Sequence, residues 1–139
     1  MEAVLWSVDD KVFAPQLDDE HEKLFADAES IRHFLVHGRY SEEPHFVLRR
    51  LTLAFLQHLA NEERLMRASR YPGLNWHERQ HQAGRSKLAR LTEAGHGSDP
   101  TAVGAALQDV VAWLKDHIAI ADRMFAAHLR NDRRIRLVS

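Results

Sequence analysis

The sequence predicts an all-α fold, an up-down-up-down antiparallel four-helix bundle with an N-terminal arm. The first observation is that apolar residues recur at spacings of three and four along four long segments, as on helices with one buried face. The second is that glycine, proline and short polar stretches separate these segments, and short connections favour antiparallel neighbours. Because 139 residues suffice for one hydrophobic core, we expect a single domain over residues 1–139.

The expected helices are defined by their apolar stripes and cover residues 18–37, 42–68, 75–94 and 100–129. In that order, the residues expected to face the core are Leu24, Ile31 and Leu35; Leu48, Leu51, Phe55, Leu59, Leu65 and Met66; Leu88 and Leu91; and Val103, Leu107, Val110, Leu114, Ala121 and Met124. Residues 1–17 should form the arm, anchored outside the bundle by Trp6 and Phe13, with Pro15 shaping its approach to the first helix. Residues 130–139 should form a basic tail.

Two of the helix starts carry residues that favour capping. Ser41 can cap the second helix, and Pro44 is tolerated in its first turn. Asp99 followed by Pro100 is typical of an N-cap with proline at the first helical position. These residues therefore support the starts of the second and fourth helices.

The helix ends and the third start are marked as well. Gly38 can end the first helix and Gly95 the third, because glycine readily adopts the conformation that follows many helices. Tyr71-Pro72-Gly73 breaks the chain between the second and third helices. Asn75-x-x-Glu78 has the pattern of a capping box, in which the Glu78 carboxylate accepts from the Asn75 backbone. This pattern gives Glu78 a structural role.

Composition excludes several classes of protein. The formal net charge is −1, so no bulk field attracts nucleic acid or a membrane surface. The chain has no cysteine, which excludes disulfides, zinc–thiolate sites and cysteine-ligated iron–sulfur clusters. No stretch resembles a signal peptide or approaches membrane-spanning length, so we expect a cytoplasmic protein. The unusual feature is the presence of ten histidines.

One stretch has the form H-E-x-x-H-x-x-G, which opens a zinc-protease signature: His77, Glu78, His81 and Gly84. The longer form of that signature requires a third histidine where this chain has Lys87, and an ammonium group has no lone pair for a metal. A lone zinc motif would also leave unexplained the five other ligand-type residues that are described next. We therefore reject the protease interpretation.

Seven polar residues lie on or beside the apolar stripes: His21, His58, Glu62, His77, His81, His117 and Asp122. Burial without partners would cost about 2–7 kcal/mol for each group, so these residues need partners. In an up-down bundle the start of the first and third helices and the end of the second and fourth lie at the same level. The seven side chains should therefore converge in one layer, as metal ligands do.

The spacing of these residues fits ligation by two ions. His58 and Glu62, like His77 and His81, are four residues apart and share a helix face. Five imidazoles and two carboxylates are too many for one zinc ion and suit two ions bridged by the carboxylates, with iron or manganese favoured by nitrogen and oxygen ligands. The five-residue step from His117 to Asp122 predicts a π-type widening of the fourth helix. The other histidines are expected to be ordinary core or surface residues: His33, His37, His45, His96 and His128.

The motifs LDDEH (17–21), HLANEERLM (58–66), YP…HERQH (71–81) and WLKDHIAIAD (113–122) resemble those of the hemerythrins, most closely the bacterial hemerythrin-like proteins. The resemblance extends from Trp6 to about Phe125. It implies one iron held by His77, His81 and His117, and a second iron held by His21 and His58 with an open position. It also implies that the two irons are bridged by Glu62, Asp122 and an oxo or hydroxo group. Dioxygen would bind reversibly at the open iron as hydroperoxide.

The resemblance further implies an apolar oxygen pocket formed by Leu24, Leu59, Trp113, Leu114 and Ile120. Core packing alone would also explain these five residues. The family more often has isoleucine and glutamine where this chain has Leu17 and Glu20. Glu20, next to a ligand, would add negative charge that bears on oxygen affinity and autoxidation.

Several alternatives stay open at this level. A ferritin-like di-iron oxidase would use Glu-x-x-His pairs, which Glu42–His45 and Glu78–His81 match formally, although Pro44 places the first pair at a helix start. A metal-free scaffold is another possibility, as is a di-iron enzyme acting on peroxide, nitric oxide or ferrous iron. Oxygen storage, delivery and sensing would share one site, and no partner protein is indicated. The four arginines of residues 130–139 fit a solvated helix end or a docking strip for an anionic partner.

Overall fold

A computed structural model describes residues 2–38, 42–97 and 99–132 of the chain. Within these ranges the regular structure is entirely helical, and the prediction of an all-α chain is confirmed. The four long helices are α1 (Pro15–Val36), α2 (Glu42–Ala68), α3 (Leu74–His96) and α4 (Pro100–His117). A short 3₁₀ helix, η1 (Val8–Asp10), precedes them; a π-helical segment, η2 (Ile118–Asp122), and α5 (Arg123–Asn131) continue α4.

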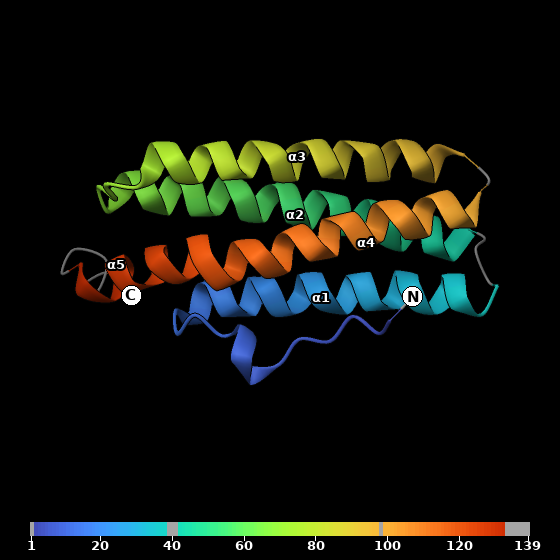
Figure 1. Cartoon of the computed structure of the whole chain (residues 1–139), viewed down its shortest axis with the longest axis horizontal. Helices are drawn as coiled ribbons and strands as arrows, with labels where there is room; N and C mark the ends of the chain where they lie inside the picture. The colour runs from blue at the N-terminus through green and yellow to red at the C-terminus, as the bar shows by residue number, and fades with distance from the viewer. Residues whose placement is uncertain (1, 39–41, 98, 133–139) are drawn as a thin grey trace.

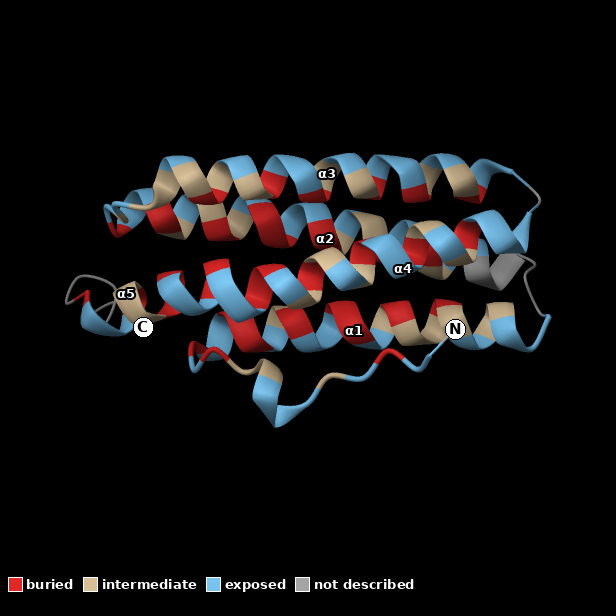
Figure 2. Cartoon of the chain, in the orientation of Figure 1, coloured by how far each residue is buried: buried red, intermediate tan, exposed pale blue. Residues whose placement is uncertain are grey.

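The four long helices lie side by side along the long axis of the molecule, as in a four-helix bundle (Figure 1). Contacts join α1 to α2, α2 to α3, α3 to α4, and α4 back to α1. Their buried faces point inward around a common core (Figure 2). The starts of α1 and α3 lie at the same end of the bundle as the ends of α2 and α4 (Figure 1), which is the end that carries the polar cluster described below.

Local chemistry sets the start of α4 and the end of α1 as the sequence predicts. The Asp99 carboxylate accepts a hydrogen bond from the Thr101 backbone N–H at 3.0 Å, and Pro100 occupies the first helical position. Helix α1 ends at Val36, and Gly38 follows with φ of +65°, a value that glycine adopts at little cost. The predicted cap of α2, Ser41, lies outside the described residues.

Three predicted boundaries are corrected. Helix α3 begins at Leu74 after Gly73 and has no side-chain cap, so the predicted capping box of Asn75 is wrong. Its end lies one residue beyond Gly95, at His96. Helix α1 begins at Pro15 rather than at residue 18, because proline takes the first helical position.

The predicted widening of the fourth helix is confirmed by the π-helical segment η2, Ile118–Asp122. One extra residue in a turn rotates everything after it by about 100° relative to an uninterrupted α-helix. Phe125 and Ala126 consequently face the core. Met124, which was expected in the core, is 54 % exposed. The widening therefore explains why that one prediction is wrong.

The N-terminal segment lies along the outside of α1 (Figure 1). Its buried anchors are Val4 and Val12, while Trp6 packs against the core only partly buried. Phe13, the other expected anchor, is 65 % exposed, so that prediction is wrong. The Asp18 carboxylate accepts from the backbone N–H groups of Val12 and Phe13 at 2.8 and 3.1 Å, and Phe13 has φ of +62°. This local turn directs the Phe13 ring outward.

The arm is also tied to the helix that carries part of the polar cluster. The Lys115 ammonium donates to the Leu5 carbonyl at 2.9 Å and to the Asp10 carboxylate at 3.0 Å. Burial acts to raise the pKa of Asp10, but the Ser7 backbone N–H and Lys115 outweigh it and hold the pKa below its usual range.

None of the described helices has a stretch long and apolar enough to cross a bilayer.

Candidate metal centre

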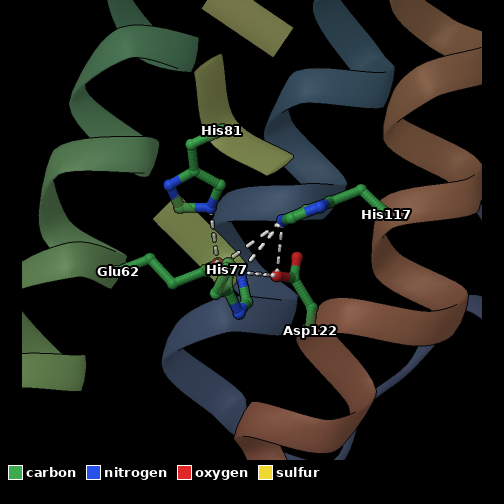
Figure 3. A group of neighbouring side chains, drawn as sticks. All are labelled: Glu62, His77, His81, His117 and Asp122. Carbon is green, nitrogen blue, oxygen red and sulfur yellow. Dashed lines mark hydrogen bonds and ion pairs between the residues drawn. The ribbon is translucent and has the colours of Figure 1, made fainter. Parts of the chain in front are cut away.

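The seven residues predicted to converge lie together at one end of the bundle. They come from all four long helices and η2: His21 from α1, His58 and Glu62 from α2, His77 and His81 from α3, His117 from α4, and Asp122 from η2. None of the seven is more than 4 % exposed. Figure 3 shows five of them pointing toward one another. A buried layer of five imidazoles and two carboxylates is therefore present.

The layer consists of two overlapping groups. Within each group, the possible ligand atoms all lie within 4.8 Å of one another. The larger group contains three histidines and two carboxylates: His77, His81, His117, Glu62 and Asp122. The smaller contains two histidines and the same two carboxylates: His21, His58, Glu62 and Asp122. The two groups thus share both acidic residues and have no histidine in common, and the larger group has one more histidine than the smaller.

Asp122 faces both groups with different oxygens. Its Oδ1 lies 3.1 Å from His77 Nε2 and 3.0 Å from His117 Nε2, both in the larger group. Its Oδ2 lies 2.9 Å from His21 Nε2 in the smaller group. The π-helical segment makes this possible, because it moves Asp122 onto the face of His117 despite the five-residue step. One carboxylate therefore spans the two halves of the layer.

Glu62 is placed in the same way from the opposite side. Its Oε1 lies 2.5 Å from His77 Nε2 and 3.1 Å from His81 Nε2. Its Oε2 lies 3.3 Å from His58 Nε2. Two carboxylates thus span the two halves, as in the bridging arrangement predicted for two ions.

The buried polar atoms of the layer fit cations better than they fit one another. Among the described residues, both oxygens of Asp122, the Oε2 of Glu62 and the Nε2 atoms of His21 and His58 have no hydrogen-bond partner of suitable geometry. The Nε2 atoms of His77 and His117 face each other at 3.0 Å. Buried polar atoms without partners are costly. Cations placed between these atoms would satisfy them, so the residues present fit a pair of metal ions.

Two further carboxylates contact the rings of two predicted ligands on the side away from the layer. The Nδ1 of His58 contacts Glu20 Oε1 at 2.6 Å, and the Nδ1 of His81 contacts Glu63 Oε2 at 2.7 Å. A bond at Nδ1 fixes the tautomer and directs Nε2 into the layer. Glu63 was not among the predicted site residues. Its position beside Glu62 is the only sequence signal, because the contact depends on how α2 and α3 pack.

The electrostatics of the layer favour positive charge inside it. Burial acts to lower the pKa of His58, but the hydrogen bond with Glu20 and the nearby Glu62 carboxylate outweigh it and raise the pKa to about 10. Burial likewise acts to lower the pKa of His77, but Asp122 and Glu62 outweigh it and raise the pKa to about 9. Burial acts to raise the pKa of Glu62, but its histidine neighbours hold it well below the usual range. Bound cations would take the place of these protons.

Apolar side chains surround the layer. Leu24, Leu59 and Leu114 are buried, and each lies three residues from a predicted ligand on the same helix face. Ile120, the fifth residue of the predicted oxygen pocket, is 59 % exposed, so its prediction as a lining residue is wrong. The extra residue of η2 turns Ile120 toward solvent and buries Ile118 instead.

Trp113, also predicted to line the pocket, stacks on His117 with ring centroids 4.5 Å apart. Gly84 on α3 makes this possible, because a Cβ there would lie 2.6 Å from the indole ring. Glu78 forms an ion pair with Arg67 on α2. The glycine and the glutamate of the H-E-x-x-H-x-x-G stretch thus have packing and pairing roles.

The remaining histidines lie outside the layer. Four of them are exposed: His33, His37, His45 and His96. His128 is half-buried, and its Nε2–H donates to the Ser69 carbonyl at 2.8 Å. None of the five belongs to the two groups of possible metal ligands.

A bundle of helices around buried histidines and shared carboxylates defines a class of cation-binding helical domains. A model of the hemerythrin HHE cation-binding domain matches residues 12–129 of the chain. The chain therefore belongs to the hemerythrin family. No curated protein matches the sequence.

Proposed function

We propose that the protein binds two iron ions and uses them to bind dioxygen reversibly, as an oxygen carrier, store or sensor rather than as an enzyme. The observation that carries the proposal is the sharing of Glu62 and Asp122 by two histidine groups of unequal size. In this proposal Glu62 and Asp122 bridge the ions. Nitrogen and oxygen donors without thiolate suit iron.

The unequal groups support a position for oxygen on one side only. The larger group offers three imidazoles and the smaller group two, His21 and His58. With the bridging carboxylates equally available to both ions, the ion beside His21 and His58 has one fewer protein ligand. Dioxygen is therefore proposed to bind there.

The surroundings of the layer support binding without further reaction. When bound, the iron pair would supply the electrons that dioxygen accepts. Leu24, Leu59 and Leu114 are buried beside the ligands, and Trp113 covers His117. Such apolar walls exclude water and slow the entry of protons, which favours release of oxygen over its reduction.

The first experiment is a visible spectrum of the iron-loaded, reduced protein under argon, after admission of air, and after renewed purging with argon. A band that appears with oxygen and disappears on purging is expected. Irreversible bleaching or steady oxygen consumption would contradict the proposal and favour an enzyme acting on peroxide, nitric oxide or ferrous iron. A protein that takes up no iron would overturn it.

A pair of matched variants sharpens this experiment. His58→Gln removes a predicted ligand of the smaller group and is expected to abolish the oxygen-dependent band. His96→Gln removes an exposed histidine outside both groups and is expected to leave the band unchanged. Equal loss of the band in both variants would count against the assignment of His58.

A further inference from the structure

The two carboxylates behind the layer, Glu20 and Glu63, make matching contacts, one with each group of histidines. Glu20 contacts the Nδ1 of His58, in the two-histidine group, at 2.6 Å. Glu63 contacts the Nδ1 of His81, in the three-histidine group, at 2.7 Å. By geometry alone, each would increase the electron donation of its imidazole to the same degree.

Their other neighbours differ in charge. Glu63 also forms an ion pair with the Arg85 guanidinium, at 2.9 and 3.0 Å to its two oxygens. The second oxygen of Glu20 accepts from the neutral Asn61 amide at 3.2 Å. In the described part of the chain, Glu20 makes no ion pair with lysine or arginine; the nearby Arg64 donates to the Asn61 oxygen instead.

The histidines that receive these contacts are themselves buried, while the carboxylates are only partly so. The side chain of His58 is 1 % exposed and that of Glu20 is 25 % exposed. A charge separated from the layer by one imidazole, with little water between, acts on it more strongly than an exposed charge. The negative charge of Glu20 is therefore felt in the layer, and that of Glu63 is largely offset by Arg85.

We propose that Glu20 is a positioning residue that makes the ion beside His21 and His58 more electron-rich than a neutral residue at that position would, and so lowers the reduction potential of the pair. This inference rests on the proposed function. An acceptor carrying a full negative charge strengthens the His58 donor and stabilises the ferric over the ferrous state. Glu20 thereby favours electron donation to dioxygen on the proposed oxygen-binding side, at the cost of faster loss of the reduced state.

The test compares midpoint potentials of the iron-loaded protein and its variants by spectroelectrochemical titration. Glu20→Gln keeps an acceptor for His58 but removes the charge, and it is expected to raise the potential and slow autoxidation several-fold. Glu63→Gln is the matched control and is expected to shift the potential less. A shift of equal size in both variants, or no shift in Glu20→Gln, would overturn the inference.

A third variant tests the part assigned to Arg85. Arg85→Met leaves Glu63 without its cation, so Glu63 should then act as Glu20 does and the potential should fall. An unchanged potential in Arg85→Met would contradict the explanation from charge. Iron content measured on every sample distinguishes failure of the proposed function from failure of this inference. A wild-type protein without two irons would contradict the proposed function. Iron-loaded variants with the same midpoint potential as the wild-type protein would contradict only the role of Glu20.

Discussion

The indole of Trp113 stacks on the imidazole of His117, with ring centroids 4.5 Å apart and planes inclined by 14°. The indole has room there because residue 84, one helix away, has no side chain: a Cβ would lie 2.6 Å from the ring. A small residue on α3 thus determines how closely an aromatic wall covers a predicted ligand on α4.

Gly84→Ala should therefore displace Trp113 and disturb His117. We expect a loss of about 1–3 kcal/mol in the free energy of unfolding, as for other overpacked sites. Gly104→Ala is the matched control, because its Cβ would lie 3.8 Å from Leu35, an ordinary contact distance. The higher helix propensity of alanine should then raise the free energy of unfolding by about 0.5–1 kcal/mol. Urea unfolding of the metal-free proteins measures both. A stabilising Gly84→Ala would show that the stacking is not tightly packed.

The two groups of possible ligands predict different losses of metal for different variants. His21→Gln should remove one ion and leave the other, because His21 belongs only to the smaller group. Glu62→Gln should weaken the binding of both ions, because Glu62 belongs to both groups. Iron per chain after reconstitution is the measurement, with His33→Gln, an exposed change on the same helix as His21, as the control. Equal metal loss from His21→Gln and Glu62→Gln would contradict a bridging role.

The convergence of the seven side chains could be predicted from the sequence, because helix period and short connections together fix both the face and the level of each residue. The widening at η2 could also be predicted, since five residues between His117 and Asp122 do not fit one face of an α-helix. Both features follow from the spacing of residues along the chain alone.

Features that depend on packing or on the placement of one extra residue could not be predicted. The direction of Ile120 depends on where the widened turn inserts its residue. The contact of Glu63 with His81 and Arg85 depends on the register between α2 and α3. The outward turn of Phe13 depends on its positive φ, which the Asp18 contact holds.

The metal-free protein should lose stability as the pH rises. The folded-state pKa of His58 is about 10 and that of His77 about 9, against 6.5 in the unfolded chain. Groups with raised pKa values stabilise the fold fully below pH 6.5, and this contribution disappears as the pH rises through 9 to 10. Metal ions require neutral imidazoles, so the loaded protein should not show this decline.

Urea unfolding at pH 6.5 and at about pH 9.5, with and without metal, measures the difference. His58→Gln should reduce the decline in the metal-free protein, because it removes one of the titrating groups. A metal-free protein whose stability is constant over this range would show that Glu62 and Asp122 do not raise the pKa values of these histidines.

Arg70 offers a test of backbone strain at the end of α2. It has φ of +52°, a conformation that costs a residue with a side chain about 1–2 kcal/mol. The turn is held by hydrogen bonds from Arg70 N–H to the Arg67 carbonyl at 3.1 Å and from Tyr71 N–H to the Met66 carbonyl at 2.9 Å. Arg70→Gly should relieve the strain and stabilise the protein by about 0.5–1 kcal/mol in urea unfolding. Arg70→Ala keeps the Cβ and should give no gain; equal stabilisation by both changes would assign the effect to loss of the arginine side chain instead of to the backbone.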